Sequence, residues 1–282
     1  MTYVLLSVLC SVAVSVLLKL ATRLRIEIGQ AVAWNYAVAA VLAGWLLEPT
    51  AAPLKQAGVP WLALIGLGVL LPTIFLALGA SVRHAGIVRS DAAQRLSLLI
   101  SLLAAFWLFG QHFDALIGVG CALGLAAMAA MVWREPVAGH AARGTAAWGY
   151  PLLVFVGAGV IDVLFKRVAA ARIPLGTALL VTFGLALLVA FGIEFARRTH
   201  FNRRSLAGGV VLGLLNFGNI LFYLRAHRAL PQNPALVFAS MNLGVVAVGA
   251  LTGLLLFRER LGRINAFGLG VALVAVALLT HG

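Results

Sequence analysis

Long apolar segments alternate with short polar connections along the chain. Each segment is close to the ~20 residues that a helix needs to cross the hydrocarbon of a bilayer. The apolar runs are continuous and do not alternate with polar positions, so they indicate helices and argue against the strands of a membrane barrel. We predict ten spanning helices, at residues 3–21, 31–47, 61–82, 90–109, 115–133, 148–167, 175–195, 207–224, 235–257 and 264–280.

The longest polar connection follows the fifth segment. It begins at Arg134-Glu135-Pro136 and divides the chain into a first five-helix repeat (1–134), a linker (135–147) and a second five-helix repeat (148–282). An odd number of spans in each repeat places the second copy in the membrane with opposite topology. The sequence therefore predicts an all-α membrane protein of ten transmembrane helices, built as two inverted repeats.

Two lysines lie in matching surroundings and support the duplication. Lys19 follows Val14-Ser15-Val16-Leu17-Leu18, and Lys166 follows Ile161-Asp162-Val163-Leu164-Phe165, 147 residues later. A second match joins Leu96–Phe109 to Gly244–Phe257, because both apolar runs end in Leu-Phe before a short polar turn.

Composition agrees with a chain whose main solvent is lipid. Hydrophobic residues make up 63% of it and charged residues 10%, against about 45–50% and about 25% in soluble domains. The net charge of +13 does not indicate nucleic-acid binding, since the arginines are spread over short connections. Contact with membrane lipids explains the charge better.

The arginines also predict an orientation. Connections 1–2, 3–4, 5–6, 7–8 and 9–10 hold most of them, so the positive-inside rule makes these connections cytoplasmic and puts both termini outside. The opposite side holds Lys55, Arg167, Arg172, Arg225 and Arg228.

The arrangement resembles the drug/metabolite transporter superfamily, and specifically its ten-span EamA-type members. The resemblance covers nearly the whole chain and is most specific in Leu255-Leu256-Phe257-Arg258-Glu259-Arg260-Leu261 and in Gly268-Leu269-Gly270. Gln111 stands in the first half where the family carries a second glutamate. The resemblance implies secondary transport of small metabolites or drugs across the bacterial inner membrane, with the site between the halves.

The paired lysines are the first candidate substrate-binding residues. The alternative is that Lys19 and Lys166 snorkel, with the stem in lipid and the ammonium at the interface. Asp162 lies four residues before Lys166 and can pair with it on one helix face. Ser15 takes the corresponding place before Lys19, so we expect Lys19 to be freer to meet an anionic substrate.

Paired helix interruptions are the second candidate feature. Pro72 and the sequence Asn216-Phe217-Gly218-Asn219 stand at roughly corresponding places, and we expect each to interrupt its helix near a midplane binding site. The alternative is a simple kink or a packing feature. Since amides in lipid need partners, at least one of Asn216 and Asn219 should face the interior.

Further polar residues complete the candidates. Gln94 matches Asn242 between the repeats, and Asn35 and Tyr223 could add polar tips to a pocket. Asp91 and Arg95 form a structural ion pair at the start of their segment. An interfacial belt explains Trp34 better than a pocket does, and it also fits four other tryptophans, Trp45, Trp61, Trp133 and Trp148. His84, His200 and His227 are expected to contact headgroups.

These observations favour a secondary transporter that exports or exchanges a small polar or anionic metabolite, with protons as a possible coupling ion and a monomer or homodimer as the assembly. Proton-coupled efflux of cationic drugs is one alternative, although the first span carries no acid. The other is a non-transporting scaffold or a lipid-metabolite enzyme. Enzymatic motifs, metal-ligand clusters and cofactor motifs are absent from the sequence, so we expect neither catalysis nor a cofactor.

Overall fold

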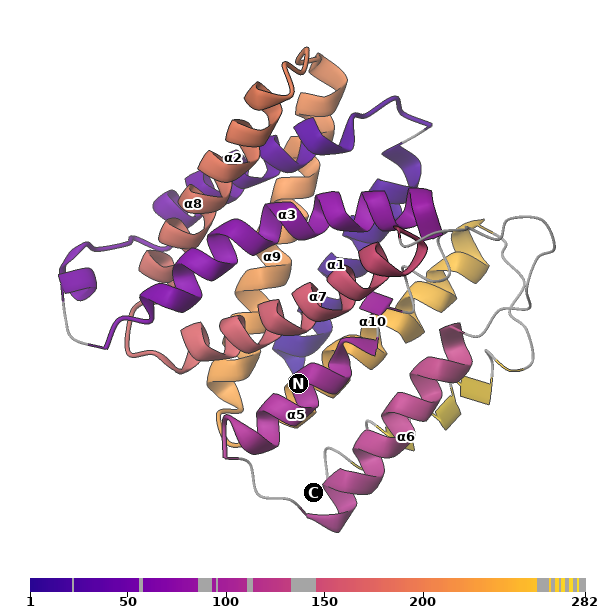
Figure 1. The fold of residues 1–282 in the computed structure, drawn as a ribbon. Coiled ribbons are helices and arrows are strands. Elements are labelled where there is room, and N and C mark those ends of the chain that lie inside the picture. The colour runs from indigo at the N-terminus through magenta and orange to yellow at the C-terminus, as the bar shows by residue number, and fades with distance from the viewer. Residues whose placement is uncertain are drawn as a thin grey trace. The chain divides into compact units, whose positions relative to one another are not determined.

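The computed structural model is helical throughout the part of the chain that it describes (Figure 1). Nine α-helices and one short 3-10 helix lie in that part, and no strand occurs in it. The predicted all-α class is therefore confirmed. The described residues are 1–21, 23–55, 58–85, 93–94, 96–110, 114–132, 146–257 and the positions 264, 267–268, 270–271, 274–275 and 278.

Apart from α5, which begins at Leu98 inside the predicted segment 90–109, the α-helices begin and end within a few residues of a predicted segment. The tenth predicted span, 264–280, lies largely outside the described residues, so the count of ten stays a prediction. The helices are α1 (Thr2–Ala21), α2 (Ile28–Leu46), α3 (Trp61–Ala85), α5 (Leu98–Trp107), α6 (Ala115–Val132), α7 (Ala146–Ala170), α8 (Leu175–Ala196), α9 (Arg203–Ala229) and α10 (Pro234–Phe257), with the 3-10 helix η1 at Ala52–Lys55.

Among the described residues, three helices are long and apolar enough to cross a membrane. They are α3, over Trp61–Leu78, and the full lengths of α8 and α9. Shorter apolar stretches occur in α1, α5, α6 and α10. Helices of this length and composition satisfy their backbone hydrogen bonds internally, and they indicate a membrane protein.

The chain forms two compact units. Unit 1 holds Met1–Phe75 and Leu164–Ala229, and unit 2 holds Leu76–Val163 and Leu230–Gly282. Each unit thus takes residues from both predicted repeats, 1–134 and 148–282. The repeat boundaries themselves stay a prediction.

Close helix packing forms the core of unit 1. Helix α2 packs against both α8 and α9, and α1 packs against α9 (Figure 1). A Cβ atom added at Gly209 would lie 2.5 Å from the Trp34 Cβ, and one at Gly213 would lie 2.7 Å from the Val38 Cβ. These two glycines, four residues apart on α9, let the α9 backbone approach α2 as small residues do in membrane helix pairs.

Hydrogen bonds join two connections at one end of unit 1. Asn202 caps α9, because its Oδ1 accepts from the Ser205 N–H at 2.8 Å. The Ser205 hydroxyl oxygen accepts from the Glu27 N–H at 2.9 Å, and Gln30 Nε2 donates to the His200 carbonyl at 2.8 Å. The α1–α2 and α8–α9 connections, which the loop charges assign to one membrane side, therefore lie together.

The opposite end of unit 1 is joined in the same way. The Thr50 N–H donates to the Thr177 hydroxyl at 3.2 Å, and that hydroxyl donates to the Thr50 carbonyl at 3.0 Å. This contact ties the end of α2 to the start of α8.

The expected helix interruptions at Pro72 and Gly218 do not occur. Helix α3 runs from Trp61 to Ala85 with Pro72 inside it, and α9 runs from Arg203 to Ala229 through Gly218. A proline removes one backbone donor only, and the neighbouring Thr73 hydroxyl adds a bond to the Val69 carbonyl at 2.8 Å. Spanning helices tolerate proline and glycine where such local bonds remain available.

Unit 2 is built around α10, which packs against α5 and α6. Leu243 of α10 lies against Gly124 of α6. A Cβ atom added at Gly124 would lie 3.2 Å from the Leu243 Cδ1. The Ser101 hydroxyl donates to Asp162 Oδ2 at 2.8 Å and joins α5 to α7.

Candidate functional site

A stripe of polar and aromatic side chains runs along α9. Asn216, Asn219, Tyr223 and His227 follow one another at intervals of three or four residues, which places them on one side of the helix. Asn216, Tyr223 and His227 are at most 5% exposed, and Asn219 is half-buried. We call these four residues the α9 stripe, and they form the candidate site in unit 1.

The first member of the stripe is bonded to α2. Asn216 Nδ2 donates to Asn35 Oδ1 at 3.1 Å, and Asn35 is completely buried. The Asn35 Nδ2 and the hydroxyl of Tyr36, both buried, have no hydrogen-bond partner among the described residues. These two buried groups can therefore donate hydrogen bonds to a small polar ligand or to an ordered water.

The second member is bonded to α1. The Ser7 hydroxyl lies 2.7 Å from Asn219 Oδ1 and 2.9 Å from the Asn219 carbonyl oxygen. Both amides of the stripe are therefore bonded within unit 1. The prediction that at least one of them faces the interior is confirmed.

The last two members meet α7. Lys166 is 4% exposed, and its ammonium interacts electrostatically with His227. The Tyr223 ring lies edge-on to His227, with 4.7 Å between ring centroids, and edge-on to Phe165, with 6.0 Å. A snorkelling lysine would be exposed on the protein surface, so burial favours an interior role for Lys166.

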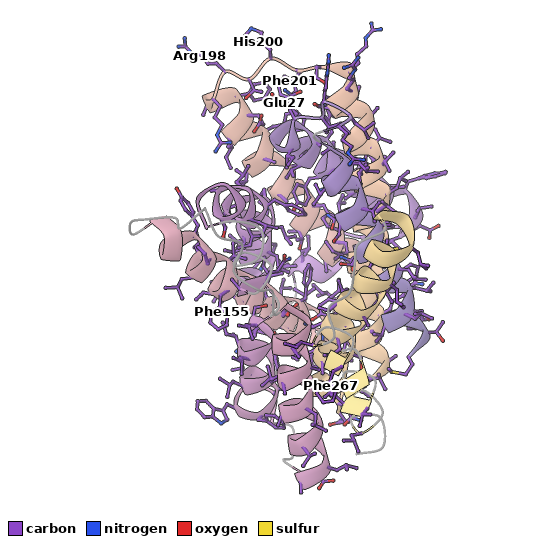
Figure 2. The ribbon with its side chains drawn as sticks, turned by 90° about the vertical axis from the view of Figure 1, so that its right-hand side faces the viewer. Glu27, Phe155, Arg198, His200, Phe201 and Phe267 are labelled. Carbon is purple, nitrogen blue, oxygen red and sulfur yellow. The ribbon has the colours of Figure 1, made fainter. Side chains whose placement is uncertain are left out.

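The expectation that His227 contacts headgroups is wrong. Its side chain is 1% exposed, because α9 continues to Ala229 and keeps His227 one turn beyond Tyr223. His200, in contrast, is exposed in the α8–α9 connection, and Figure 2 shows it at one end of unit 1.

Arg228 fixes the end of α9 beside the stripe. Its Nη2 donates to the Ile173 carbonyl at 2.6 Å and its Nε to the Ala169 carbonyl at 3.2 Å. The guanidinium thus bonds one carbonyl in the last turn of α7 and one in the α7–α8 connection. A cation at this place also complements the dipole of α7.

The other predicted residues either belong to unit 2 or lie outside the described residues. Gln94, Asp162 and Asn242 lie in unit 2, where Asn242 Nδ2 donates to the Phe238 carbonyl of its own helix at 3.0 Å. The pairing of Gln94 with Asn242 and that of Asp162 with Lys166 stay predictions. The Lys19 side chain and all of Asp91 and Arg95 lie outside the described residues.

Sequence reasoning missed Ser7 and His227 as site residues. His227 could have been found, because it follows Tyr223 by four residues on the same helix face. Ser7 could not, since a lone serine in an apolar helix gives no sign of a partner 212 residues away.

The chemistry of the stripe is hydrogen bonding combined with positive charge. The stripe offers amides, a phenol and an imidazole, and Lys166 of α7 adds a buried ammonium. Among the described residues, no group of three or more His, Cys, Asp or Glu could hold a metal ion. Such a set is suited to binding a small polar or anionic compound.

Comparisons with known proteins extend these observations. No family model matches the chain. A protein of Haemophilus influenzae, described as uncharacterized, is 40% identical to it over 98% of this chain and 96% of its own length. A solved crystal structure of 15% sequence identity matches it with a TM-score of 0.73 over 99% of this chain and 98% of that one. At such low identity the match shows the fold alone.

Proposed function

We propose that this chain, which belongs to the same family as the uncharacterized protein of Haemophilus influenzae, is a secondary transporter for a small polar or anionic metabolite. It moves a compound such as an amino acid across the bacterial inner membrane by alternating access. It is a transporter of the drug/metabolite superfamily, of the EamA type, with ten spans in two inverted repeats, and it is not an enzyme.

The observation that carries the proposal is the α9 stripe with Lys166. Polar groups inside spanning helices are costly and mark substrate or ion pathways. Here Asn216, Tyr223 and His227 are buried on one helix, and the buried donors of Asn35 and Tyr36 lack a partner among the described residues.

Ligand-dependent thermal stabilisation tests the proposal on purified protein in detergent. The panel consists of amino acids, nucleotide sugars, phosphorylated sugars and quaternary amines, because a ligand that binds the folded state raises its stability by mass action. We expect one polar or anionic class to raise the melting temperature, and we expect Lys166→Gln to abolish that rise.

A matched control separates loss of the site from general damage. Thr252→Val removes a hydroxyl that donates to the Val248 carbonyl of its own helix at 2.8 Å in unit 2, so it should leave the ligand response unchanged. The proposal is wrong if no class stabilises folded wild-type protein, and stabilisation by quaternary amines alone would instead support efflux of cationic drugs.

A further inference from the structure

Two arginines hold a backbone conformation that side chains rarely adopt. Arg25 has φ 55° and Arg198 has φ 54°, in the left-handed region. Glu48 is the remaining non-glycine residue with positive φ among the described residues. A left-handed residue other than glycine raises the energy of the folded state. The presence of arginine at both positions therefore calls for a functional explanation.

Both arginines follow the end of a helix in the same way. After α1, the Ile26 N–H donates to the Ala21 carbonyl at 2.9 Å, and after α8 the Thr199 N–H donates to the Glu194 carbonyl at 3.2 Å. These six-residue turns are Schellman caps, and the left-handed residue in them is usually glycine. The sequence therefore has arginine twice where glycine would fit the backbone better.

The two caps lie at the same end of unit 1. The Glu27–Ser205 and Gln30–His200 hydrogen bonds join their connections, and Figure 2 shows Glu27, Arg198, His200 and Phe201 together there. We call residues 23–27 and 194–204 the arginine end. It carries two glutamates, Glu27 and Glu194, against six arginines: Arg23, Arg25, Arg197, Arg198, Arg203 and Arg204.

Exposed apolar side chains stand among these charges. Phe195 is 66% exposed, Leu24 is 50% exposed and Phe201 is 41% exposed. The six arginines are exposed as well, so both kinds of group face outward. Water alone suits the guanidinium groups but not the rings, whereas the boundary between headgroups and acyl chains suits both.

We infer that the arginine end binds anionic phospholipid. The guanidinium groups of Arg25 and Arg198 bond the lipid phosphate, as arginine does in charge-assisted pairs, and the exposed rings contact the upper acyl chains. Phe195 touches the rings of Phe191 and Phe201, with 6.0 Å and 5.9 Å between ring centroids, yet most of its surface stays exposed. A soluble acidic partner would match the charge but would leave the exposed faces of Phe195 and Leu24 in water. This inference concerns lipid and is independent of which compound the chain transports.

The experiment uses three variants of the full chain in neutral detergent micelles, titrated with phosphatidylglycerol or phosphatidylcholine. Arg25→Gly/Arg198→Gly removes both charges and relieves both left-handed positions. Arg25→Lys/Arg198→Lys keeps charge and backbone conformation. Arg172→Gly is the control, since it removes an exposed arginine between α7 and α8, at the other end of α8 from Arg198.

We expect the glycine double variant to melt a few °C above wild type without lipid, because glycine relieves both left-handed positions. It should nevertheless need about 30-fold more phosphatidylglycerol for the same stabilisation, since each basic residue contributes about 1 kcal/mol to binding anionic lipid. The lysine variant should keep most of the lipid response, Arg172→Gly all of it, and phosphatidylcholine should have little effect.

Three results would overturn the inference. The first is an unchanged phosphatidylglycerol response in the glycine double variant. The second is an equal loss of that response in Arg172→Gly, because it would show that the response depends on net charge and not on the arginine end. The third is an equal stabilisation of wild type by soluble glycerol phosphate or polyglutamate, since that would identify the partner as an aqueous anion rather than a lipid.

Discussion

At the scale of single residues, the amides of Asn35 and Asn216 lie 181 residues apart in the sequence and 3.1 Å apart in unit 1. Each would be an unsatisfied polar group in an apolar helix bundle without the other. Their bond therefore links α2 to α9 and holds the first part of the α9 stripe in place.

Replacing one amide should cost more than replacing both. Asn216→Leu leaves the buried Asn35 Oδ1 without its donor and should lower the free energy of unfolding by about 1–3 kcal/mol. Asn35→Leu/Asn216→Leu removes both polar groups and should recover much of that loss. Denaturant unfolding in mixed micelles measures the free energy of unfolding of both single variants and the double variant. A loss in the double variant equal to the sum of the two single losses would contradict the pairing.

Part of the α9 stripe could be predicted from residue chemistry alone. The cost of an amide in lipid indicated that Asn216 or Asn219 faces the interior, which the structure confirms. The identity of each partner could not be predicted, because Ser7 and Asn35 acquire their roles from tertiary packing. The apolar run ends at Leu224 and so predicts a loop position for His227, whereas α9 continues to Ala229 and buries that side chain.

At the scale of helices, the apolar run underestimates the length of α9. The run 207–224 predicts the centre of α9, but the helix begins at Arg203 and ends at Ala229. Arginine and histidine continue the helix into the interface without adding to the apolar pattern. Pro72 and Gly218 predict breaks because proline and glycine disfavour a helix interior, but α3 and α9 run through them.

The contact between α2 and α9 depends on glycine. A Cβ at Gly213 would lie 2.7 Å from the Val38 Cβ and 2.9 Å from the Asn35 carbonyl oxygen, whereas one at Gly184 of α8 meets nothing within 4 Å. Gly213→Ala should therefore destabilise the protein by about 1–3 kcal/mol through overpacking. Gly184→Ala should be neutral or slightly stabilising, because alanine favours a helix over glycine.

Thermal melting of the two variants in the same micelles checks this pair. Equal melting temperatures for Gly213→Ala and Gly184→Ala would show that the α2–α9 approach is looser than described. The spacing of Gly209 and Gly213 was visible in the sequence, but which helix they face was not.

At the scale of the whole molecule, the compact units cross the predicted repeats. Unit 1 combines α1 and α2 with α8 and α9, so the candidate site draws on both sequence halves. Periodicity and matching lysines could predict a duplication, but they carry no information about which helices of the two copies pack together. Which helices pack together depends on the shape of their surfaces, such as the face of α9 that carries Gly209 and Gly213.

Vesicle counterflow tests the central claim of transport most directly. Wild-type protein is reconstituted into vesicles preloaded with an unlabelled compound that stabilises it, and labelled compound is added outside. We predict that wild-type vesicles accumulate the label transiently, while Lys166→Gln and protein-free vesicles do not. Wild-type vesicles that accumulate no more label than protein-free vesicles, for every stabilising compound, would contradict the account.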